Sequence, residues 1–155
     1  MLRISQKLEY ATRAMIELSH RQAEGVLVPA REIAEAQQIP LRFLEQQLGT
    51  LAKAGLIDSH RGAGGGCRLA RPAAEISMGE IADAIEGAFY PMFCLEPGDE
   101  TCFQDSTCGL QGLWDEVQGA VRDVFAKTTV ASLAEKHHKP PRPVFTADEL
   151  VRNLL

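Results

Sequence analysis

The chain has 155 residues, a formal net charge of −5 and 45% hydrophobic residues. This length predicts one domain, or a small domain with a dimerisation arm, and the apolar fraction suffices for an ordinary core. No apolar run approaches the roughly 18–20 residues that a membrane span needs, and the first residues hold no stretch of signal-peptide length. We therefore expect no membrane partner and a cytoplasmic location.

Charge is divided unevenly along the chain. Residues 1–72 carry ten Lys/Arg and seven Asp/Glu, whereas residues 73–155 carry six and fourteen. A basic half joined to an acidic half is typical of nucleic-acid-binding proteins, although scattered solvated charges give the same numbers. The negative total therefore does not exclude DNA as a partner of the first half.

Helical and strand patterns in the first half predict a winged helix-turn-helix. Apolar residues at helical spacing indicate a first helix over about 5–22, and two shorter helices over 29–36 and 40–55 are joined by a tight turn. Two short strands, over 56–60 and 67–70, flank the glycine-rich tip 61–66 and form a hairpin, the wing. Ser77 and Glu80 have capping-box spacing, which begins a fourth helix that Gly87 ends.

The second helix of a helix-turn-helix lies in the major groove and reaches base edges with its first residues. Here these are Arg42, Glu45 and Gln46. Arginine can pair with guanine, glutamine with adenine, and glutamate can accept from cytosine. Arg61 at the wing tip suits a phosphate or the minor groove. Further candidates for phosphate contacts, each of which is alternatively a solvated surface group, are Lys7, Arg31, Lys53 and Arg68.

One long helix is expected from about Leu110 to His137, which is 28 residues or about 42 Å. A domain of this size cannot cover such a helix, so we expect its apolar stripe to pack on the same helix of a second subunit. Packing within one chain is the alternative. The stripe consists of Leu110, Leu113, Trp114, Val117, Val121, Val124 and Phe125.

Three of the four cysteines, Cys94, Cys102 and Cys108, lie in the loop 88–109 with the spacing C-x7-C-x5-C. Clustered cysteines in a reducing cytosol favour metal or redox chemistry over disulfides. Structural zinc sites usually have tighter pairs, whereas thiolates around an iron–sulfur cluster enclose a larger object. The residues alone leave cluster, zinc and incidental thiols open. Cys67 is interpreted as a small buried hydrophobe, and no C-x-x-C pair supports a thiol enzyme.

The expected organisation has four parts. Residues 1–87 form the DNA-binding domain, 88–109 the cysteine loop, 110–138 the dimerisation helix and 139–155 a tail. The fold class is mainly α with a small β wing, and the protein is not an enzyme.

The chain resembles the IscR/NsrR/RirA family of winged-helix regulators over nearly its full length. The similar segments are Met1-Leu2-Arg3-Ile4-Ser5 through Glu9-Tyr10-Ala11, Phe43-Leu44-Glu45-Gln46, Leu51-Ala52-Lys53-Ala54-Gly55-Leu56 and Arg61-Gly62-Ala63-Gly64-Gly65-Gly66. The cysteine spacing, followed by Gly109-Leu110, is similar to that of the RirA-type members. The resemblance implies a homodimer on promoter DNA, base reading at Glu45 and Gln46, and a cluster whose state sets operator affinity.

Three cysteines leave one iron without a protein ligand. IscR-type members use a histidine three residues after the last cysteine, where this chain has Gln111. NsrR-like members use a carboxylate from the first helix of the partner subunit, and Glu9 matches that position. An i,i+4 ion pair with Arg13 is the alternative role of Glu9. For the cofactor we prefer a 4Fe–4S to a 2Fe–2S cluster.

The expected function is a cluster-sensing repressor of genes for iron–sulfur assembly, iron supply or nitrosative and oxidative stress. The alternative is a winged-helix regulator without a cluster, controlled by a protein partner or by zinc or thiol state.

Overall fold

The computed structural model describes residues 4–98 and 108–136. Its elements are α1 (Gln6–His20), η1 (Gln22–Glu24), α2 (Ala30–Gln37), α3 (Leu41–Lys53), β1 (Ile57–His60), β2 (Gly66–Leu69), η2 (Ala73–Glu75), α4 (Met78–Glu86), η3 (Phe93–Leu95), α5 (Gln111–Lys127) and α6 (Val130–Lys136). The expected class, mainly α with a small β wing, is confirmed. Among the helices of these two ranges, none is long and apolar enough to serve as a membrane span.

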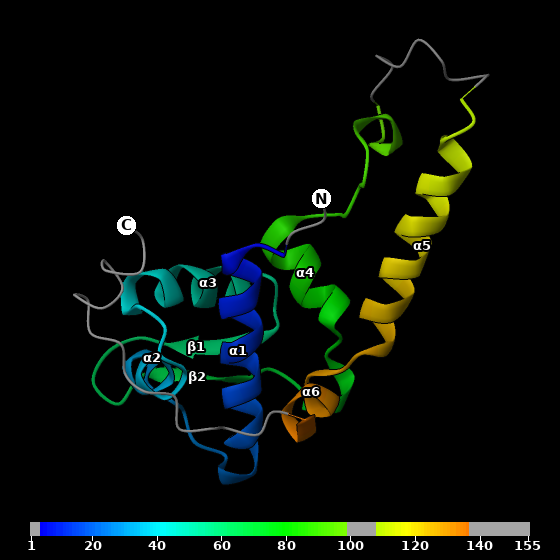
Figure 1. Cartoon of the computed structure of the whole chain (residues 1–155). Coiled ribbons are helices and arrows are strands. Elements are labelled where there is room, and N and C mark those ends of the chain that lie inside the picture. Colours follow the sequence, from blue (N-terminus) through cyan, green and yellow to red (C-terminus); the bar gives the residue numbers. More distant parts are fainter. Residues whose placement is uncertain (1–3, 99–107, 137–155) are drawn as a thin grey trace, which may run out of the picture.

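Residues 4–86 and α6 together form the head of the molecule. Helix α1 is its central element, and α2, α3, α4 and α6 all pack against it (Figure 1). Ser5 caps its start by accepting a hydrogen bond of 3.2 Å from the Leu8 amide. Ala11, Ala14 and Met15 are completely buried. Burial of a side chain the size of methionine stabilises a fold by about 1.5–3 kcal/mol, and the two alanines let neighbouring helices approach α1 closely.

The wing is an antiparallel hairpin in which Ile57 pairs with Leu69 and His60 with Gly66. Val28 adds a third backbone segment, because it exchanges two hydrogen bonds of 2.8 Å with Cys67. A Cβ on Gly66 would lie 2.7 Å from the Val28 backbone, and Gly64 has a φ of +77° that favours glycine. Turn geometry and close backbone packing therefore explain why several positions at the tip of the wing are glycine.

The expected single helix over 110–137 is wrong. Helix α5 ends at Lys127, Thr128 is extended, and α6 begins at Val130. Two backbone hydrogen bonds hold the junction on the start of α4, from Met78 to Thr128 (2.7 Å) and from Val130 to Ile76 (2.9 Å). Val130 is completely buried, so turning the chain back onto α1 covers apolar surface that a straight helix would expose. At 17 residues, α5 is about 26 Å long.

Candidate DNA interface and cysteine loop

Helix α3 has one buried face and one open face. Leu44, Leu48 and Leu51 are at most 4% exposed and anchor the helix in the core. Arg42, Glu45 and Gln46, the expected base-reading residues, are exposed on the other side, in the first two turns. The buried leucines thus fix the rotation of α3 that turns these polar side chains outward.

The turn between α2 and α3 is held by a buried polar pair. Gln38 forms the turn with a left-handed φ of 53°, and the preceding Gln37 is only 4% exposed. The Gln37 side chain donates a hydrogen bond of 2.8 Å to the carboxylate of Glu17 on α1, which is equally buried. The Arg13 guanidinium donates to the Gln37 backbone carbonyl. Buried polar pairs are costly unless satisfied, so this network fixes the turn against α1.

Arg21 extends the network toward the start of α2. Its guanidinium lies 3.5 Å from Glu17 and 3.2 Å from Glu32. Glu17, Arg21 and Glu32 were not among the residues predicted from the sequence to form the site. The four-residue spacing of Glu9, Arg13, Glu17 and Arg21 was the available signal, since it places alternating charges along one side of α1.

The candidate phosphate contacts fall into two groups. Lys7, Lys53 and Arg61 are exposed, as is the base-reading candidate Arg42, and in the described part of the chain none of them makes an ion pair. Arg31 lies 3.5 Å from Glu35, and Arg68 lies 3.1 Å from Asp58. The first group is therefore better placed to pair with phosphate, because none of its members has a competing carboxylate among the described residues.

Two further residues of α3, Phe43 and Gly49, were not predicted from the sequence as functional residues. Phe43 is 57% exposed, although a phenylalanine three residues into an amphipathic helix would ordinarily face the core. Gly49 lies in the helix interior on the open side, and a Cβ there would meet nothing within 4 Å. An interior glycine costs about 1 kcal/mol relative to alanine, and the fold itself does not require this one.

The structure describes two of the three loop cysteines. Cys94 lies in η3 and Cys108 lies three residues before α5, and both are half-buried. Cys102 lies outside the described residues. Over residues 4–98 and 108–136, no three His, Cys, Asp or Glu side chains gather into a metal-binding group. A metal site at this loop would therefore need Cys102, a partner subunit or both.

Cys67 has a different environment from the loop cysteines. It is 4% exposed on β2, and its thiol lies 3.8 Å from the Ser59 hydroxyl as a weak donor. Burial raises the pKa of the Cys67 thiol above its ordinary value. The expectation of a small buried hydrophobe is confirmed, since a protonated thiol in the core is a poor metal ligand.

Glu9 is exposed in the first turn of α1, and its carboxylate lies 3.4 Å from the Arg13 guanidinium. The ion pair considered as its alternative role is present. The Glu9 side chain is 58% exposed and that of Arg13 is half-buried, so a pair with this spacing is worth only about 0.3–0.5 kcal/mol. The Glu9 carboxylate could therefore exchange Arg13 for a stronger partner at little cost in stability.

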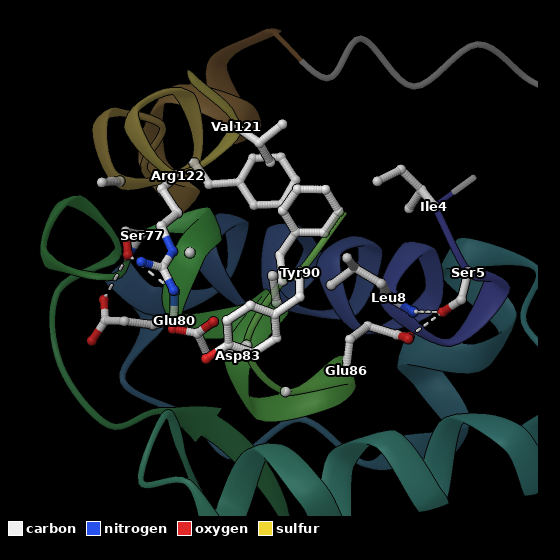
Figure 2. Close-up of a pocket in the computed structure, with 17 residues that line it drawn as sticks. Ile4, Ser5, Leu8, Ser77, Glu80, Asp83, Glu86, Tyr90, Val121 and Arg122 are labelled. Atoms are coloured by element: carbon white, nitrogen blue, oxygen red, sulfur yellow. Dashed lines mark hydrogen bonds between the residues drawn. The ribbon is translucent and has the colours of Figure 1, made fainter. Parts of the chain in front are cut away.

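A groove of about 770 Å³ lies between the start of α1, α4 and the second half of α5. Figure 2 shows Ile4, Leu8, Tyr90 and Val121 around it, with a hydrogen bond from Ser5 to Glu86 at its edge. Beyond this groove the first half of α5 leaves the head (Figure 1). Leu110, Leu113 and Val124 are at least 50% exposed, so these positions of the apolar stripe are uncovered in the single chain.

The helix-turn-helix, its open reading face and the adjoining wing define the class of DNA-binding transcription regulators. The family model of the Rrf2 regulators, described as an iron-dependent transcriptional regulator, matches residues 4–136. The chain belongs to the Rrf2 family.

Individual relatives agree with this assignment. A Mycobacterium tuberculosis protein named as a helix-turn-helix-type regulator is 37% identical over 133 residues, which are 86% of this chain and 81% of its own length. IscR of Serratia proteamaculans is 33% identical over 85% of this chain and 79% of its own length. The structure of CymR, the global cysteine regulator of B. subtilis, matches with a TM-score of 0.71 and 31% identity, covering 89% of this chain and all of CymR.

Arg61→Ala and Gln46→Ala are expected to weaken DNA binding in different ways. Loss of a wing cation should reduce affinity for all duplexes and lower the slope of log affinity against log salt by about one unit per phosphate contact. Loss of Gln46 should cost about 1–3 kcal/mol at one base position. Fluorescence anisotropy over a salt series and a set of point-substituted operators measures both. Unchanged binding by both variants would contradict the assigned interface.

Proposed function

We propose that this protein is a homodimeric, cytoplasmic regulator whose affinity for promoter DNA depends on an iron–sulfur cluster held by Cys94, Cys102 and Cys108. The observation that carries the proposal is that Cys94 and Cys108 border one loop and are half-buried, unlike the buried Cys67. Its expected targets are genes for iron–sulfur assembly, iron supply or stress by oxidants and nitric oxide, and we expect repression.

The surroundings of Cys108 suit an anionic group. Helix α5 begins three residues later, and neither a side-chain cap nor an acidic first turn occurs there in the described structure. Unpaired amide groups and the helix dipole favour negative charge at such a position. A bound cluster would supply a centre that responds to iron, oxidants or nitric oxide, and the protein's part is to hold it with thiolates.

The uncovered stripe on α5 supports a symmetric dimer. Trp114, Val121 and Phe125 are partly buried in one protomer, whereas Leu110 and Leu113 are exposed at the free end. An antiparallel pair of α5 helices crossing near Val117 would place Leu113 against the partner's Val121. The exposed free end of each helix would then enter the groove of the other subunit, which is the self-complementary contact that a two-fold dimer needs.

The same pairing supports Glu9 as the ligand from the partner subunit. The groove lies beside the first turn of α1, so a helix start inserted there would bring Cys108 toward the partner's Glu9. Within one protomer Arg13 bridges Glu9 and the carbonyl of Gln37 at the helix-turn-helix turn. If Glu9 served as a ligand to the group held by the partner's cysteine loop, its ion pair with Arg13 would be weakened. That change alters one hydrogen-bonded support of the turn and thereby the position of α3.

A cluster-free regulator is the second candidate. The similarity to CymR, described as a global cysteine regulator and not as an iron–sulfur protein, supports a regulator controlled by a protein partner or by zinc or thiol state. In that case the loop cysteines would bind zinc or remain thiols.

Purification without oxygen, followed by assay of iron, zinc and acid-labile sulfide, separates the two candidates. We expect a coloured protein with iron and sulfide, and loss of both in Cys94→Ser. The matched control is Cys67→Ala, which removes the buried thiol outside the loop and should keep the cluster. A colourless wild-type protein without labile sulfide after reconstitution would exclude the cluster, and zinc in its place would favour the second candidate.

A further inference from the structure

We propose that Phe43 is a specificity-determining residue that reads the 5-methyl group of a thymine in the operator. Its ring is 57% exposed at the start of α3, while the next residue, Leu44, is completely buried. Phenylalanine gains most of its stabilisation from burial of its 150–250 Å² surface. Since Phe43 contributes little to the core, its apolar surface is available to a binding partner.

The position of Phe43 in α3 indicates that this binding partner is DNA. It is the third residue of α3, and the first residues of a recognition helix are those that reach base edges. Arg42, Glu45 and Gln46 around it are exposed and polar, so the surface around Phe43 is the one that enters the major groove. This step depends on the DNA-binding class of the family and is independent of the cluster.

The chemistry of the groove floor then selects thymine. The 5-methyl group of thymine is the apolar feature that base pairs present in the major groove, and phenylalanine is among the side chains that contact it. Gln46 lies one helical turn beyond Phe43, on the same side of α3, and glutamine pairs with adenine. The two side chains together fit an A·T pair, or two adjacent pairs of this kind.

Gly49 makes this contact geometrically easier. It follows Gln46 by three residues on the open side of α3, and the space around its Cβ position is empty. Without a side chain there, the helix can lie deeper in the groove, which brings the rigid ring of Phe43 to the base edges.

The test uses the wild-type dimer and an operator selected with it from random duplexes. Each thymine base is replaced singly by uracil, which removes only the methyl group. We expect one position in each half-site at which the wild type binds roughly three- to tenfold more weakly, the range expected for one buried methyl group. Phe43→Ala should bind the thymine and uracil duplexes equally well at that position.

Two further variants keep the result interpretable. Val26→Ala removes another exposed apolar side chain (48% exposed) outside α3 and should retain the full uracil penalty. If Phe43→Ala binds too weakly to measure, Phe43→Leu keeps an apolar contact and should show a reduced penalty at the same position. A uracil penalty that is unchanged in the Phe43 variants, or absent at every position in the wild type, would overturn the proposal.

Discussion

Replacing Glu9 by alanine should make the bound cluster at least about tenfold shorter-lived, while the protein remains dimeric. Loss of even an outer-sphere partner of a metal ligand typically costs 10–100-fold in affinity, and loss of a direct ligand should cost no less. The ion pair with Arg13 contributes little stability because the Glu9 carboxylate is exposed, so folding should be unaffected. The decay of visible absorbance under a chelator measures cluster lifetime, and sedimentation measures the dimer.

Glu35→Ala is the matched control for this substitution. It breaks an ion pair with Arg31, 3.5 Å long, that has the same i,i+4 spacing as the pair of Glu9 and Arg13, although both of its side chains are more exposed. We expect wild-type cluster lifetime in this variant. Equal lifetimes for the Glu9 and Glu35 variants would remove Glu9 from the site and leave the fourth ligand to another group.

Leu113→Asp should dissociate the dimer. Leu113 is 50% exposed in one protomer, and in the paired arrangement its side chain enters the partner's groove. An uncompensated charge buried there costs about 3–5 kcal/mol, and a two-fold dimer buries two of them, so dimerisation should weaken by at least about ten-thousandfold. Sedimentation velocity over a concentration series measures the shift, and affinity for a two-half-site operator should fall with it.

Gln111→Asp is the matched control, because it adds the same charge to the same end of α5. Its side chain is exposed on a different side of the helix from the apolar stripe, and an acidic residue suits a helix start. This variant should remain dimeric. A monomeric Gln111 variant, or a dimeric Leu113 variant, would contradict the assignment of the stripe as the interface.

Local sequence signals identified most elements of the head correctly. The capping box of Ser77 and Glu80 is present, with the Glu80 carboxylate 2.9 Å from the Ser77 amide, and this hydrogen bond lowers the pKa of Glu80. The strand boundaries of the wing agree within one residue of those expected. Capping and alternation are short-range effects, so a single sequence is sufficient to detect them.

Local sequence signals could not predict that the long helix ends at Lys127. Thr128 and Thr129 are compatible with a helix, and the apolar pattern continues through Val130. Two long-range features decide the break: the backbone pairing of this junction with residues 76–78 and the burial of Val130. Neither feature produces a periodic pattern in the amino-acid sequence from which the break could be predicted.

Some features of the candidate site could likewise be predicted from the sequence, whereas others are seen only in the tertiary structure. The amino-acid sequence determined that three thiols share one loop, that polar residues start α3, and that a wing follows, because spacing along the chain carries this information. Only the tertiary structure decided that Glu17 and Gln37 form a buried pair beneath the turn and that Phe43 faces outward. Burial and partner choice depend on how helices pack, and packing joins residues whose separation along the chain is too large for any local pattern to encode.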